Sequence, residues 1–253
     1  MATQLLFYES ALPVSSQRHA NWSVEVGADY AFTRNVNSVP LMAVEFSHAA
    51  PEYAIVFAGR DNDVTPAVVL GLRRNENNYL TSENKWDAKY IPAFVRRYPF
   101  VFSTDAAANT FTLCIDEAFK GFNQEGRGER LFNDEAKPTP YVQRVLEFLQ
   151  EYQAQFRRTQ SLCRRLTELN LLEPMEAQVT LKSGAQLSLT GFQVVNRDRL
   201  RNLSGDALAG LAKNDDLELI YTHMQSVGRF SELVNRLAGT AAPTGNTQEP
   251  ATA

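Results

Sequence analysis

The longest periodic pattern in the chain runs over residues 140–171, where apolar residues recur at spacings of three and four. This spacing places them on one face of a helix. Thr139 precedes Pro140, a pair typical of a helix start, because threonine caps free N–H groups and proline is tolerated in the first turn. The pattern therefore predicts one long helix, with an apolar face made of Val142, Val145, Leu146, Leu149, Tyr152, Phe156, Leu162, Leu166 and Leu169.

Apolar runs in the first half of the chain predict strands. Residues 53–58 and 67–72 are short and apolar, and turn residues separate them. Residues 110–115 alternate between polar and apolar side chains, which is typical of a half-buried strand. A further strand is expected to begin at residues 79–80.

Two short helices are expected among these strands. One begins at Pro40, which suits a first helical turn, and buries Leu41, Val44 and Phe46. The other covers residues 89–97.

After the long helix, alternation of polar and apolar residues over 179–190 predicts a β-hairpin that turns at residues 183–184. Three helical patterns follow. Ser204 is placed to cap the first, the second begins near Asp215, and the third includes Phe230.

Together these elements predict an α+β fold: a mixed sheet region with short helices, a long central helix, a β-hairpin and a helical C-terminal part. Residues 1–135 form a mixed α/β N-terminal part, and residues 136–239 carry the long helix, the hairpin and the last helices, packed against it. Residues 240–253 show no apolar periodicity, which predicts a disordered tail.

Composition narrows the class of protein. The 253 residues carry a formal charge of −4, which argues against a nucleic-acid partner, because such proteins need a basic face. The longest apolar run, residues 53–58, is far shorter than the roughly 20 residues of a membrane helix, so no membrane insertion is expected. The first twelve residues lack a secretory signal pattern, and two cysteines do not form a disulfide framework. We therefore expect a soluble, cytoplasmic protein.

The chain lacks the motifs of phosphate loops, dinucleotide folds and zinc proteases, so the sequence assigns no catalytic residue, cofactor or metal. Glu45 and His48 lie three residues apart on an expected helix and are a candidate acid–base or binding pair; a solvated pair is the simpler interpretation. Asp116 follows a strand, where carboxylates often line clefts, although solvation in a loop is again simpler. Cys114 and Cys163 are expected to pack as small hydrophobic residues, and His223 as a core or rim histidine.

Residues 86–100, which we call the aromatic–arginine segment, combine five aromatic residues with two prolines and a pair of arginines. One interpretation is a recognition surface for a peptide, a carboxylate or a sugar. The other is packing, in which Phe94, Tyr98 and Phe100 fill the core and one arginine is held internally. The candidate ligand-binding residues in the segment are Trp86, Tyr90, Arg96, Arg97 and Tyr98.

Many short motifs occur together along the chain: VPL at 39–41, EF at 45–46, YAIVF at 53–57, LGLR at 70–73, NEN at 75–77, YIPA at 90–93, RRYPF at 96–100, CID at 114–116, LF at 131–132, GF at 191–192, LS at 203–204 and IYTH at 220–223. In this combination the chain resembles the SapC family of bacterial proteins over about residues 7–237. It does not match the peptide-transporter permease of the same name, because it has no membrane helix.

The resemblance implies a role and no mechanism. The family was named for association with a bacterial surface layer and its secretion. Its members resemble accessory proteins found beside TonB-dependent receptors, flavin-dependent halogenase-like proteins and cupin-like proteins. This implies work near nutrient uptake or near modification of a peptide or protein, and it supplies no catalytic residues to carry over.

Three hypotheses follow. The leading one is a non-catalytic binding or accessory protein that acts with a partner enzyme or a TonB-dependent uptake system, on a peptide or protein. The second is an enzyme acting on a peptide or sugar at a site made of Glu45, His48, Arg96, Arg97 and Asp116. The third is a surface-layer or secretion component. The oligomeric state is open, and a homo-oligomer is compatible with each hypothesis.

Overall fold

The computed structural model describes residues 5–27, 29–59, 63–105, 110–180 and 186–240. Antiparallel sheets and helices occur together, with a long helix in the middle of the chain and a helical C-terminal part, so the predicted α+β class is confirmed. The expected hairpin turn at 183–184 lies outside the described residues, as does the expected tail apart from Thr240.

The largest sheet has five antiparallel strands and joins early and late parts of the chain. Phe192 and Gln193 of the hairpin pair with Ala58 and Phe57, so the hairpin extends the sheet built by the first half. The strand order is β10 (Leu172–Thr180), β11 (Gln186–Val195), β4 (Ile55–Ala58), β5 (Thr65–Val69) and β3 (Ser38–Pro40).

Two three-stranded antiparallel sheets lie beside it. One has the order β1 (Ala11–Pro13), β7 (Thr110–Asp116) and β6 (Phe100–Asp105), and the other β8 (Phe122–Asn123), β2 (Ser23–Val24) and β9 (Glu129–Arg130). A one-turn helix, α1 (Ser16–His19), lies between β1 and β2. These sheets bury their own clusters, one around Val24, Phe100 and Ile115.

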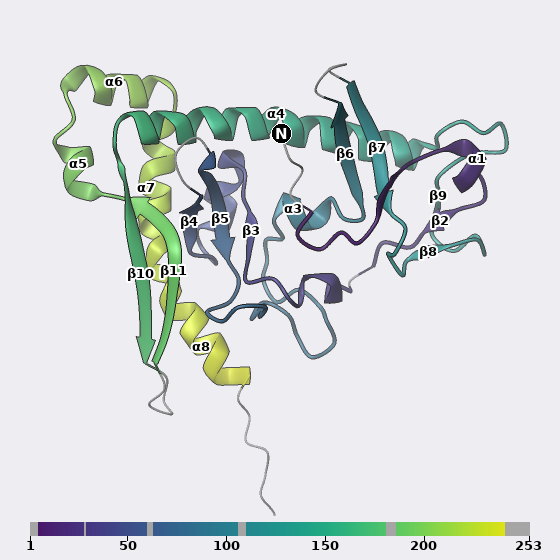
Figure 1. Ribbon diagram of the computed structural model, residues 1–253, viewed down its shortest axis with the longest axis horizontal. Coiled ribbons are helices and arrows are strands. Elements are labelled where there is room, and N and C mark those ends of the chain that lie inside the picture. Colours follow the sequence, from purple (N-terminus) through teal and green to yellow (C-terminus); the bar gives the residue numbers. More distant parts are fainter. Residues whose placement is uncertain (1–4, 28, 60–62, 106–109, 181–185, 241–253) are drawn as a thin grey trace, which may run out of the picture.

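The predicted long helix is α4 (Pro140–Glu168), and the Thr139 side chain caps it by accepting a hydrogen bond from the Val142 N–H. It runs along both sheet regions (Figure 1). Its first half packs Val142 and Leu149 into the cluster with Phe100, and its second half packs Leu162 and Leu166 into the main core. Helix α4 therefore contributes side chains to both hydrophobic clusters.

The C-terminal helices are α5 (Arg197–Arg201), α6 (Gly205–Lys213), α7 (Asp216–Ser226) and α8 (Phe230–Thr240). Ser204 caps α6 as predicted. His223 of α7 is fully buried between two strands: its Nδ1 is 3.0 Å from the Ile55 carbonyl oxygen, and its Nε2 accepts a hydrogen bond from the Val195 N–H. This histidine therefore joins β4 to β11.

The prediction that a helix begins at Pro40 is wrong. Pro40 is the last residue of β3, which is an edge strand of the sheet. A residue without an N–H is tolerated on an edge strand. Helical backbone begins with a 3₁₀ turn at Ala43–Glu45 and continues as α2 (Phe46–Ala49). As a result Val44, expected in the core, is 49% exposed.

Two further elements are shorter than expected. The strand expected at residues 79–80 is a single bridge between Leu80 and Trp86. The helix expected over 89–97 is α3 (Ala93–Arg96), with Pro92 as its N-cap. The reason is a tertiary contact: the Glu52 carboxylate, from the turn after α2, accepts the backbone N–H groups of Lys89 and Tyr90, and these residues are not helical.

Candidate ligand-binding site

Glu45 fixes the middle of the aromatic–arginine segment. Its carboxylate is buried; Oε1 accepts hydrogen bonds from the Tyr90 hydroxyl and the Ala93 N–H, both at 2.7 Å. Oε2 accepts one from the Met42 N–H at 2.8 Å. A buried carboxylate needs such donors because an unpaired charge in the interior is costly. The side chain therefore orients Tyr90 and the start of α3.

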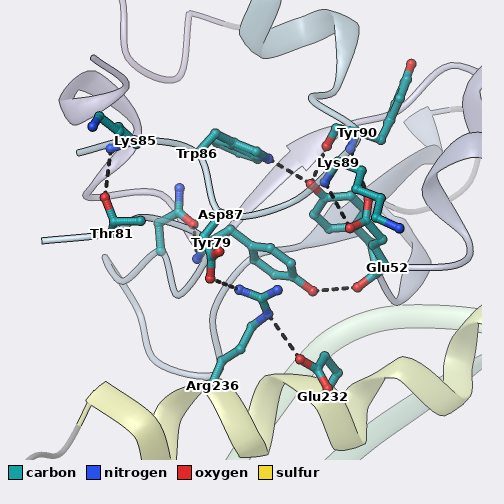
Figure 2. A network of polar contacts seen from close by, with 12 residues as sticks. Glu52, Tyr79, Thr81, Lys85, Trp86, Asp87, Lys89, Tyr90, Glu232 and Arg236 are labelled. Carbon is teal, nitrogen blue, oxygen red and sulfur yellow. Dashed lines mark hydrogen bonds and ion pairs between the residues drawn. The ribbon is translucent and has the colours of Figure 1, made fainter. Parts of the chain in front are cut away.

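A second carboxylate holds the backbone just before that point (Figure 2). The Glu52 side chain accepts the N–H groups of Lys89 and Tyr90 at 2.9 Å each. The Tyr53 hydroxyl donates to the Tyr90 carbonyl oxygen and accepts a hydrogen bond of 2.8 Å from the Trp86 indole N–H. The polar ends of Trp86 and Tyr90 are thus bound inside the protein, while both side chains remain half-buried.

The C-terminal helix closes this network. Arg236 of α8 donates to Asp87 at 2.6 Å and lies 3.4 Å from the Glu232 carboxylate, and its guanidinium lies 4.3 Å from the centre of the Tyr79 ring (Figure 2). The Tyr79 hydroxyl in turn donates to the Glu52 carbonyl oxygen at 2.7 Å. Helix α8 therefore supports the loop that carries Trp86 and Tyr90.

Arg96 is the exposed arginine of the segment. Its Nε–H donates to the Ile91 carbonyl oxygen at 3.0 Å, and its guanidinium carbon lies 5.3 Å from the Phe148 ring centre and 5.9 Å from that of Tyr90. Among the residues that the structure describes, no carboxylate forms an ion pair with it. The planar cation therefore lies close to two aromatic rings and is accessible to solvent.

A cavity of about 190 Å³ opens beside Arg96. We call it the aromatic cavity; its lining includes Tyr30, Phe32, Arg96, Tyr98, Tyr141 and Phe148. They come from the segment before β3, from α3 and the residues after it, and from the first half of α4. Trp86 adjoins the cavity through Tyr30, with ring centres 5.7 Å apart.

Arg97 and Tyr98 also line this cavity, although both are buried. The Arg97 guanidinium lies 4.0 Å from the centre of the Phe94 ring and 5.1 Å from that of Tyr152. The Tyr98 hydroxyl donates to Asp116 at 3.3 Å. These two side chains, with Phe94 and Phe100, are packed in the interior, so Arg96 is the arginine of the pair that is presented to solvent.

Asp116 is also an internal residue. Besides Tyr98, its carboxylate accepts the N–H groups of Glu9, Ser10 and Ala118 at 2.8, 3.0 and 3.2 Å. It therefore ties the N-terminal segment to the end of β7.

His48 is exposed, with its ring stacked on Tyr90 at 5.5 Å between centres. Of the residues expected in an enzyme site, Glu45, His48 and Arg96 gather around Tyr90. Asp116 is bound by other segments.

The pKa values follow from this packing. Burial raises the pKa of Tyr90, and the neighbouring Glu45 carboxylate raises it further, against a smaller lowering by Arg96. Burial and then Asp116 raise the pKa of Tyr98, and burial raises that of Tyr141 to about 12. The phenols around the site are therefore neutral hydrogen-bonding groups at neutral pH.

A second cavity, of about 400 Å³, lies between Leu5 and Leu6 and the strands β3 and β5. It is larger, but among the described residues that line it Asp63 is the one ionisable side chain. Ligand sites combine an apolar wall with several convergent polar groups, so the aromatic cavity is the stronger candidate.

Within the described ranges, no three His, Cys, Asp or Glu side chains gather in a way that would hold a metal ion. Nor does any helix in those ranges combine the length and apolar character needed to cross a bilayer.

Sequence reasoning missed the partners that complete the cavity. Tyr30 and Phe32 lie in a segment without periodicity, which carried no signal. Tyr141, Val145 and Phe148 were recoverable, because spacings of four and three residues put them on one face of the predicted helix.

The SapC family model matches residues 14–233, which is most of the chain and includes every residue that lines the cavity. The chain belongs to the SapC family. No curated protein and no solved structure matches it. The family resemblance drawn from the short motifs is thereby confirmed.

Proposed function

We propose that this SapC-family protein is a non-catalytic binding or accessory protein that recognises a peptide or protein segment at the aromatic cavity. The observation that carries the proposal is the exposed Arg96 guanidinium beside Phe148 at an aromatic-lined cavity. At about 190 Å³ the cavity is smaller than the roughly 300–1,000 Å³ of sites that enclose whole small molecules. One side chain of a larger partner suits it better.

The state of the ionisable groups supports binding without chemistry. The carboxylates of Glu45 and Asp116 are occupied by internal donors. Burial raises the pKa of the Cys114 thiol, and that of Cys163 to about 12, so both thiols are neutral and poor nucleophiles. Burial lowers the pKa of His223 to about 4, and both of its ring nitrogens contact backbone groups.

The family association supplies the expected partner. We propose that the protein works in the cytoplasm with a flavin-dependent halogenase-like enzyme or a TonB-dependent uptake system, and that the bound segment belongs to that partner or to its polypeptide substrate.

A random heptapeptide library displayed on phage tests the proposal. Enriched peptides are synthesised, and their affinity for three proteins is measured by fluorescence polarisation: the wild type, Phe148→Ala and Phe111→Ala. Phe111 is a matched control, because it is a partly exposed phenylalanine on β7 that does not line the cavity. We expect Phe148→Ala to weaken binding about tenfold or more and Phe111→Ala to leave it unchanged. A lack of enrichment, or equal affinity of both variants, would contradict the proposal.

A further inference from the structure

We infer that the aromatic cavity takes an apolar side chain that has a carboxylate next to it in the bound polypeptide. This inference rests on the proposed function and names the ligand chemistry of the same site. The juxtaposition that carries it is a guanidinium and an apolar cavity that share Phe148 as a common wall.

The guanidinium supplies the carboxylate specificity. Arginine has five N–H donors in a planar fork that matches a carboxylate. In Arg96 the Nε–H is bound to the Ile91 carbonyl oxygen, which fixes the plane of the fork. The Tyr90 and Phe148 rings on which it lies restrict it further. A preorganised cation loses little side-chain entropy on binding, so a carboxylate gains more from it than from a mobile surface arginine.

The cavity supplies the apolar specificity. Tyr30, Phe32, Tyr141 and Phe148 line it with aromatic surface. Their rings prefer an aliphatic or aromatic side chain over a hydrated polar one. Because Arg96 itself lines the cavity, a carboxylate bound to it lies at the cavity edge. The apolar side chain must therefore belong to the same residue as the carboxylate or to the next one.

One lining residue opposes this charge preference. Asp29 also lines the cavity and is exposed, with its Oδ1 accepting a hydrogen bond from the Ala31 N–H at 2.8 Å. Its negative charge disfavours a second carboxylate. Removing that charge while keeping the acceptor should therefore strengthen the binding of an acidic ligand, an effect of opposite sign to the loss of Arg96.

Two sources share this chemistry: the terminal carboxylate of a chain that ends in an apolar residue, and an internal aspartate or glutamate beside one. Four acetylated peptides separate them. The first ends in phenylalanine as the free acid, and the second is its amide. The third, with an amidated end, contains an internal Asp-Phe pair, and the fourth replaces that pair with Asn-Phe.

Each peptide is titrated into the full-length protein, and binding is followed by NMR at the Arg96 amide and the Val145 methyl groups, since both residues line the cavity. We expect an acidic peptide to bind about tenfold tighter than its neutral counterpart, which is what a charged hydrogen bond supplies. Preference for the free acid identifies a chain terminus, and preference for Asp-Phe identifies a side chain.

Three variants complete the test. Arg96→Gln should abolish the difference between acidic and neutral peptides, whereas Asp29→Asn should increase it. Arg158→Gln, the same change at an exposed arginine of α4 that does not line the cavity, should bind as the wild type.

Equal affinity for acidic and neutral peptides would overturn the carboxylate inference and leave the proposed function standing. The same holds if none of the four binds while library peptides do. If neither set binds, both fail.

Discussion

The Tyr90 hydroxyl donates a 2.7 Å hydrogen bond to the buried carboxylate of Glu45. This bond connects a fully interior group with the half-buried ring on which Arg96 and His48 lie. The exposed part of the candidate site is therefore built directly on the core and does not depend on a loose surface loop.

Replacing Tyr90 with phenylalanine tests that connection. We expect Tyr90→Phe to lower the free energy of unfolding by about 2 kcal/mol, because a carboxylate loses one of its donors. Urea denaturation measures the change. Tyr221→Phe removes the same hydroxyl from an exposed tyrosine and should change stability by less than about 0.5 kcal/mol. Equal effects of the two variants would contradict the role given to the Glu45 bond.

Helix α8 is expected to restrain the loop that carries Tyr90. Arg236→Ala removes the ion pair with Asp87 and the contact with the Tyr79 ring. Hydrogen exchange should then quicken at the Lys89 and Tyr90 amides, which are protected by Glu52, with a stability loss of only about 1 kcal/mol.

Arg73→Ala, which breaks an exposed pair with Glu76, is the control and should leave the exchange of those two amides unchanged. Unchanged exchange at both amides in Arg236→Ala would show that α8 does not hold the loop.

His223 should make stability depend on pH. The folded protein binds its proton only below about pH 4, whereas the unfolded chain binds it near the ordinary pKa of 6.5. The stabilisation that neutral His223 gives to the folded protein is therefore complete above pH 6.5. As the pH falls to 4, the free energy of unfolding decreases by roughly 3 kcal/mol for this reason. When the free energy of unfolding is measured by urea denaturation across this pH range, it should depend less steeply on pH in His223→Gln than in the wild type. An equal dependence of stability on pH in the two proteins would contradict the role given to His223.

The pairing of Arg165 with Asp216 joins α4 to the start of α7 through two hydrogen bonds. Asp216 is buried and Arg165 partly exposed, so Arg165→Ala leaves a buried charge near some water. We expect a loss of about 3 kcal/mol, at the lower end of the range for a broken buried pair. Thermal unfolding with Arg158→Ala as the exposed control measures it; an equally small effect in both would contradict the pairing.

Long-range periodicity made the helical parts predictable. Residues 140–168 repeat an apolar face over eight turns, and Thr139 marks the start, so α4 emerged almost at its true length. The start of the helix predicted at Pro40 was wrong, because proline suits both a first helical turn and an edge strand. Only the pairing of Ser38–Pro40 with β5, a tertiary contact, decides between the two.

The candidate site was also predicted only in part, because it too depends on tertiary contacts. The composition indicated the aromatic–arginine segment as a candidate site, but it did not show that the two adjacent arginines differ in burial. Arg97 packs on Phe94, whereas Arg96 is exposed. Arg96 and Arg97 point in different directions from the backbone. The apolar pattern of a helix as short as α3 is too brief to predict which of them faces the core. Tyr30 and Phe32 join the site only through folding, which no local pattern reports.

Photo-crosslinking shows which residues a bound peptide touches, and so tests whether the aromatic cavity is the binding site. A library-selected peptide that carries a diazirine in its apolar side chain is irradiated with the wild-type protein, and the cross-linked residues are identified by mass spectrometry. If the aromatic cavity binds the peptide, cross-links form at Tyr30, Val145 and Phe148 and are lost when unlabelled peptide competes. Cross-links at Leu6 and Pro66 of the second cavity, with none at those three residues, would contradict it.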